Sequence, residues 1–108
     1  MNAASPVIDP ERLRHAAGEA VATLKLLANE DRLLLLCQLA LGEMSVGALE
    51  AELGIRQPTL SQQLGVLRAE GVVQTRRQGK QVFYSVADAA LLEILGVLHR
   101  LYCPEPTP

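Results

Sequence analysis

Apolar side chains follow a helical period from near the start of the chain. Residues 1–8 form an expected flexible tail, after which Asp9 can act as an N-cap and Pro10 can occupy the first helical position. Apolar positions then recur at three- and four-residue spacing as far as about Ala28. The pattern predicts a first helix that begins directly after Asp9.

The stretch "EDRLLLLCQLAL" has the densest apolar content in the chain. Asn29 is a suitable N-cap for a second helix over 30–41, and Gly42 is a typical C-terminal stop. A helix that is apolar on most of its faces is normally surrounded by other elements. This helix is therefore expected to form the buried centre of the domain.

Two short helices are expected next, joined by the tight turn "GIRQ". Ser45 can cap the third helix, which continues through Leu53. The fourth helix is expected from about Gln57 to Glu70, with Pro58 in its first turn. Two short helices joined by a glycine-containing turn are typical of a helix-turn-helix.

The spacing of apolar residues then changes. The β-branched and aromatic runs "VVQTRR" and "KQVFYSV" flank "QG" and predict a hairpin with Gly79 at its turn. Asp88 can cap a last helix over 89–102, which Pro104 prevents from continuing into the tail, residues 104–108. The expected fold is mainly α with a β-hairpin, in the order α-α-α-α-β-β-α. It is a winged helix-turn-helix domain over residues 9–103.

Composition is consistent with one small helical domain. The chain has 108 residues, of which 49% are hydrophobic and only 3% aromatic, so leucine, valine and alanine must build the core. Its apolar runs are shorter than the ~18 residues of a membrane helix, and the N-terminus has no basic, apolar leader pattern. We expect a soluble cytoplasmic protein without a membrane partner.

The segment "QPTLSQQLGVLR" combines an apolar stripe with a polar face. Leu60, Leu64 and Leu67 share one side of the helix and are expected to be buried. The remaining face carries neutral polar side chains, namely Gln57, Thr59, Ser61, Gln62 and Gln63. Such residues can be an ordinary solvated surface, but Gln can also pair with adenine, and Ser and Thr can bind base edges or phosphates. At the second helix of a helix-turn-helix they indicate contact with the DNA major groove.

The charge distribution supports the same interpretation. The net charge is −2, which is unlike a non-specific polyanion binder, but Arg76, Arg77 and Lys80 surround the hairpin tip. A basic hairpin beside the polar helix can supply the phosphate contacts that the helix lacks. A different possibility is a helical interaction protein whose basic hairpin contacts an acidic protein partner.

The segment from Ala28 to Val86, and above all "QPTLSQQLGVLRAEGVV" with "RRQGKQVFYSV", resembles the ArsR/SmtB family of winged-helix repressors. The resemblance implies a homodimer formed by the first and last helices. It also implies binding to an inverted repeat in double-stranded operator DNA and release when an inducer binds or reacts.

Metal-sensing members of that family use ligand frames that this chain does not reproduce. The Cys-x-Cys frame of the third helix falls here on Ser45 and Gly47. The last helix offers only Asp88 and His99 for the Asp/His frame, whereas zinc normally has about four ligands. We therefore predict no metal and no cofactor. A metal-responsive repressor that uses Cys37, His99 and Cys103 remains an alternative.

The chain has two cysteines, Cys37 in the second helix and Cys103 at the end of the last helix. Their placement resembles the persulfide-sensing BigR/SqrR/YgaV subgroup of the family. The resemblance implies a thiol switch in which Cys37 attacks a reactive sulfur species and Cys103 resolves it, so that a disulfide or polysulfide bridge releases the DNA. A redox-inert repressor with two packing cysteines is the other possibility. No nucleophile–base pair or phosphate loop indicates an enzyme.

Overall fold

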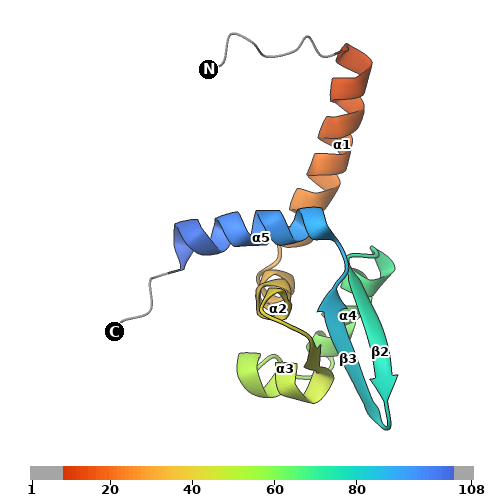
Figure 1. The fold of residues 1–108 in the computed structure, drawn as a ribbon, viewed down its shortest axis with the longest axis vertical. Coiled ribbons are helices and arrows are strands. Elements are labelled where there is room, and N and C mark those ends of the chain that lie inside the picture. Colours follow the sequence, from red (N-terminus) through yellow and green to blue (C-terminus); the bar gives the residue numbers. More distant parts are fainter. Residues whose placement is uncertain (1–8, 104–108) are drawn as a thin grey trace.

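The computed structural model describes residues 9–103, so the two predicted tails, 1–8 and 104–108, lie outside the described residues. Five helices and three strands follow one another along this part of the chain (Figure 1). They are α1 (Pro10–Leu27), α2 (Glu30–Ala40), β1 (Met44–Ser45), α3 (Val46–Leu53), α4 (Thr59–Ala69), β2 (Val73–Gln78), β3 (Gln81–Val86) and α5 (Ala89–Tyr102). The predicted order is confirmed, with one short strand added.

Four helices begin at the N-caps that the sequence predicts. Oxygen atoms of the Asp9, Asn29, Ser45 and Asp88 side chains accept hydrogen bonds from backbone N–H groups in the first turns of α1, α2, α3 and α5. These bonds satisfy donors that have no partner within the helix. The helix starts are therefore fixed by local chemistry.

The fourth helix differs from its prediction. It begins at Thr59 rather than Gln57, and Pro58 precedes it instead of lying in its first turn. The Gln57 side-chain oxygen accepts hydrogen bonds from the backbone N–H of Ser61 at 3.1 Å and from its hydroxyl at 2.6 Å. Pro58 is the N-cap, and Gln57 supplies a side-chain acceptor to the first turn from the position before it. The second helix also ends one residue earlier than predicted, because Leu41 is its C-cap.

The strands form an antiparallel sheet in the order β1-β3-β2. The β2–β3 hairpin runs from the pair Val73 and Val86 to the pair Gln78 and Gln81 at its tip. Strand β1, which the sequence did not predict, pairs Met44 with Tyr84 at the base of the hairpin. It has only two residues, too few to show an alternating pattern. This pairing ties the hairpin to the segment between α2 and α3.

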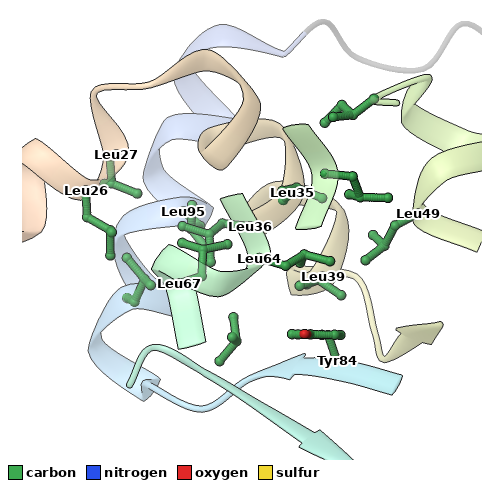
Figure 2. Close-up of a cluster of buried hydrophobic side chains, with 14 residues drawn as sticks. Leu26, Leu27, Leu35, Leu36, Leu39, Leu49, Leu64, Leu67, Tyr84 and Leu95 are labelled. Carbon is green, nitrogen blue, oxygen red and sulfur yellow. The ribbon is translucent and has the colours of Figure 1, made fainter. Parts of the chain in front are cut away.

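Helix α2 lies at the centre of the domain, as predicted, and contacts α1, α3, α4, α5 and β3. Its Leu35 and Leu36 are fully buried. Figure 2 shows them among leucines from the surrounding helices, with Tyr84 of β3 on one side of the cluster. The predicted stripe of α4, Leu60, Leu64 and Leu67, is also buried in this core. The opposite face of α4 is thereby left at the surface.

The turn between α3 and α4 depends on a left-handed residue. Gly54 has φ 68° and donates its backbone N–H to the Glu50 carbonyl at 2.9 Å. Residues with a Cβ rarely adopt this conformation. Gly54 therefore sets the angle at which α4 leaves α3.

Two glycine-to-alanine substitutions separate the cost of the left-handed backbone conformation from the effect of adding a methyl group. A Cβ at Gly54 or at Gly65, inside α4, meets nothing within 4 Å. Gly54→Ala is expected to lower the free energy of unfolding by about 1–2 kcal/mol because of its positive φ. Gly65→Ala is expected to raise it by about 0.5–1 kcal/mol, since alanine favours helix interiors. Urea unfolding at one protein concentration measures both, and equal effects would contradict the assignment.

Candidate DNA interface and thiol site

Helices α3 and α4 and the turn between them form the predicted helix-turn-helix, with the β2–β3 hairpin beside it as a wing (Figure 1). Gln57, just before α4, and Ser61 and Gln62 within α4 are exposed, whereas Thr59 and Gln63 are half-buried. Gln57 and Ser61 are held together by their hydrogen bond at the N-terminal end of the helix. The bond couples the two side chains at the exposed surface.

Gln63 lies differently from its neighbours in the sequence. Its side-chain oxygen accepts a hydrogen bond of 3.1 Å from Nη1 of Arg32, in the first turn of α2. The polar group is thus directed toward the protein, in contrast to the exposed Gln62. Sequence reasoning missed Arg32, because 31 residues separate the two partners.

The wing contains an ion pair that the sequence did not reveal. The Arg76 guanidinium donates from Nε and Nη2 to the carboxylate of Glu43, at 2.8 to 3.0 Å. It also lies 4.6 Å from the centre of the Phe83 ring, a favourable position for a cation. The hydrogen bonds to Glu43 raise the pKa of Arg76, so its positive charge is held and locally balanced. Arg76 therefore links the wing to the segment before β1 through an exposed ion pair.

Arg77 and Lys80 are the other predicted basic residues of the wing. Arg77 is exposed near the end of β2, and Lys80 is exposed in the turn that connects β2 to β3. Neither has an ion-pair partner among residues 9–103. These two side chains are consequently better placed than Arg76 to meet DNA phosphates.

The two cysteines line one pocket. Cys37 is half-buried in α2, and Cys103 is exposed just after α5. The pocket has a volume of about 460 Å³ and is also lined by Glu30, Leu33, Leu34, Leu98, His99 and Tyr102. Burial, and then the neighbouring Cys103, raise the pKa of the Cys37 thiol. The fold therefore brings together two thiols that are 66 positions apart (103 − 37).

Metal-ligand frames find little support in the described residues. Within residues 9–103, no three or more His, Cys, Asp or Glu side chains are grouped as a metal site. The side-chain oxygen atoms of Ser45 and Asp88 already accept hydrogen bonds as the N-caps of α3 and α5.

Residues 9–103 contain no helix that is both long and apolar enough to cross a membrane.

A short helix, a tight turn, a second helix with an exposed polar face and a basic hairpin define a winged helix-turn-helix protein of the DNA-binding class. Residues 29–75 match the family described as "bacterial regulatory protein, arsR family". The biofilm growth-associated repressor of Agrobacterium fabrum is 54% identical over 87 residues, which cover 81% of this chain and 74% of that protein. The chain therefore belongs to the arsR family of bacterial regulatory proteins.

Solved structures agree with this assignment. The transcriptional repressor BigR from Xylella fastidiosa superposes with a TM-score of 0.82 at 45% identity, covering 91% of this chain and 100% of that chain. Reduced HlyU from Vibrio cholerae gives a TM-score of 0.83 at 40% identity, covering 87% and 99%. The winged-helix prediction is confirmed. The family consists of DNA-binding regulators, so this chain is a regulator and not an enzyme.

The wing makes a testable distinction between its basic residues. Replacing Arg77 or Lys80 with Ala is expected to weaken binding to duplex DNA and to reduce the slope of log affinity against log salt by about one. Arg76→Ala is expected to change the slope less, because Glu43 already balances the charge of Arg76. Fluorescence anisotropy over a salt series measures this. A larger loss of slope for Arg76→Ala than for Arg77→Ala would show that the ion pair opens on DNA.

Proposed function

We propose that the protein is a homodimeric transcriptional repressor that binds operator DNA while its thiols are reduced and leaves it when a reactive sulfur species bridges Cys37 and Cys103. The observation that carries this proposal is the single pocket that both thiols line. Two relatives, from Agrobacterium fabrum and Xylella fastidiosa, are named as repressors. The repression itself is simple occlusion of a promoter by the bound dimer.

Exposed apolar side chains support dimerisation through α1 and α5. The side chains concerned are Leu13, Val21 and Leu24 on α1 and Leu92, Ile94, Val97, Leu101 and Tyr102 on α5. Helix α1 projects away from the other helices and strands (Figure 1), and its residues 10–22 are exposed within the described range 9–103. Several large apolar side chains exposed on two helices are consistent with a protein interface. In a symmetric dimer, the two copies of α4 would enter two successive major grooves, which lie about 34 Å apart along the DNA.

The thiol chemistry can be written for an organic trisulfide, R–S–S–S–R. A Cys103 thiolate attacks the central sulfur atom, an S–S bond forms, and RS⁻ leaves with the electron pair of the broken bond. The Cys37 thiolate then attacks the same added sulfur and expels the second RS⁻. The protein now contains Cys37–S–S–S–Cys103, and the two thiol protons are carried by two RSH molecules. The dithiol is oxidised by two electrons and the trisulfide is reduced by two.

The order of attack follows from the surroundings of each thiol. The thiolate is the nucleophile, and burial raises the pKa of Cys37 and so disfavours its thiolate at neutral pH. Cys103 is exposed to solvent at the rim of the pocket. These surroundings favour Cys103 as the first thiol to react and Cys37 as the resolving one. That order is the reverse of the one that the family resemblance implies.

Bridging has a structural consequence because the two thiols belong to different helices. Cys37 is part of the central α2, and Cys103 follows α5, which carries part of the proposed dimer surface. A covalent link between them constrains how α5 packs on α2 and therefore how the two protomers are oriented. Coupling of about 1–3 kcal/mol between bridge and operator corresponds to a 5–150-fold loss of affinity.

The proposed dimer interface is tested by charge insertion. Leu24→Glu and Leu101→Glu are expected to convert the dimer to a folded monomer, because both side chains are exposed in the single chain. Ala51→Glu, on the exposed surface of α3, is the control and is expected to leave the dimer intact. Sedimentation velocity at micromolar concentration measures the mass. Unchanged dimers in both leucine variants would place the interface elsewhere.

The thiol switch is tested with serine variants. Cys37→Ser and Cys103→Ser are expected to bind operator DNA as tightly as the reduced wild-type protein, but to keep that affinity after exposure to a dialkyl trisulfide. Wild-type protein is expected to lose affinity and to gain one bridging sulfur atom, measured by anisotropy and intact mass on the same samples. Full release of either serine variant by the trisulfide would refute the two-thiol mechanism. The same proteins are also treated with hydrogen peroxide, so that release from DNA by trisulfide is compared with release by another oxidant.

The order of attack is tested with the same two variants. Cys103 in the Cys37→Ser protein is expected to react faster with trisulfide at pH 7 than Cys37 in the Cys103→Ser protein. Because burial raises the pKa of Cys37, its rate is expected to keep increasing as the pH rises through the ordinary thiol range. Stopped-flow or quenched mass measurements between pH 6 and pH 9, roughly the range around ordinary thiol ionisation, give both rates. Faster reaction at Cys37 would restore the order implied by the resemblance.

A further inference from the structure

One side chain connects three helices of the domain. The Arg32 guanidinium donates from Nε to the Leu26 carbonyl at 2.7 Å and from Nη2 to the Lys25 carbonyl at 3.1 Å. Its third nitrogen, Nη1, donates to the side-chain oxygen of Gln63 at 3.1 Å. Arg32 belongs to α2, the two carbonyls belong to the last turn of α1, and Gln63 belongs to α4.

The chemistry of each partner explains why an arginine suits this position. The last carbonyls of a helix have no donor four residues further along the same helix. The Lys25 carbonyl accepts from the Ala28 N–H and also from Arg32, and the Leu26 carbonyl accepts from Arg32. A planar guanidinium presents several N–H groups at fixed angles and can bind acceptors on different elements at once. Arg32 is half-buried, as is Gln63, so these bonds are partly shielded from competing water. The α4 helix is thereby held relative to the junction of α1 and α2.

Arg32 and Cys37 lie on different sides of the same helix. Five residues of α-helix separate them by about 7.5 Å along the axis and by roughly 140° around it. Cys37 faces the pocket against α5, whereas Arg32 faces α1 and α4. A change in how α2 packs against α5 is therefore expected to alter the Arg32 hydrogen bonds on the other side of α2.

We propose that Arg32 is the positioning residue that transmits the packing of α1 and α2 to the recognition helix α4, with Gln63 as its acceptor. This inference rests on the proposed function in that α4 reads operator DNA and the Cys37 bridge alters α2. It assigns to Gln63 a role in holding α4 rather than in reading a base. The Arg32 bonds to α1 and the bond to α4 act as one unit, because a single rigid group makes them.

Two substitutions break the connection at different points. Arg32→Gln removes the fork, whereas Gln63→Met removes only the acceptor on α4 and leaves the α1 carbonyls available to Arg32. Gln63→Glu is the conservative variant, because its carboxylate still accepts from the guanidinium. Lys25→Gln is the matched control, since it removes a positive charge beside Arg32 while keeping the backbone carbonyl that Arg32 binds.

The first readout is amide hydrogen exchange of the reduced protein, which does not depend on thiol chemistry. Gln63→Met is expected to speed exchange by about tenfold not only in α4 but also in the last turn of α1, the order of effect expected for a lost local contact. Gln63→Glu and Lys25→Gln are expected to resemble the wild type in both helices. An effect of Gln63→Met that is confined to α4 would overturn the inference, whatever happens to overall stability.

The second readout is the ratio of operator dissociation constants after and before trisulfide bridging. In Arg32→Gln and Gln63→Met this ratio is expected to fall to within about threefold of one. The Gln63→Glu protein is expected to keep the wild-type ratio. A purely stabilising role would lower the unfolding midpoint without changing the ratio. If both variants keep the wild-type ratio, the inference fails. If the wild type itself shows no change of affinity, the proposed thiol switch fails, and the exchange experiment still decides the role of Arg32.

Discussion

Leu35 and Leu36 hold the domain together, because α2 is the element on which α1, α3, α4, α5 and the wing strand β3 all pack. Both side chains are fully buried, so a displacement of α2 exposes apolar surface or forces its neighbours to follow. Close-packed interiors are stiff and transmit such displacements rather than absorbing them. In a domain this small, the same helix that stabilises the fold is therefore also the element through which a local chemical event can reach the DNA-binding surface.

The parts of the fold that local chemistry determines could be predicted from the sequence. The caps of α1, α2, α3 and α5 and the buried stripe of α4 depend on residues within one or two turns of each other, and all are confirmed. The predicted start of α4 is two residues too early, because Pro58 is the N-cap and Gln57 lies before the helix, where its side chain accepts from the Ser61 N–H. Strand β1 was missed, since its two residues form a strand only through pairing with β3.

The candidate site divides in the same way between local and distant contacts. The polar face of α4, the basic wing and the two cysteines were all visible as residue types in the sequence. The partners of Arg76 and Gln63 were not, because Glu43 and Arg32 lie 33 and 31 residues away from them. Those partners change the structural roles of Arg76 and Gln63. Arg76 is paired with Glu43, and the half-buried Gln63 is bonded to Arg32, so fewer polar side chains are free to bind a ligand than the pattern alone indicates.

The small net charge of the protein and its architecture together limit how it can bind DNA. A net charge of −2 and a neutral polar face on α4 provide little general attraction to DNA. In the proposed dimer, affinity must therefore come from a few phosphate contacts and from correct placement of the two α4 helices. A repressor that depends on placement is sensitive to small rotations of that helix. Cys37 and Arg32 occupy different sides of α2, one beside the thiol pocket and the other bonded to α1 and α4. In the proposed mechanism, a bridge of a few sulfur atoms would act on operator binding by shifting α2, which already contacts α1, α4 and α5.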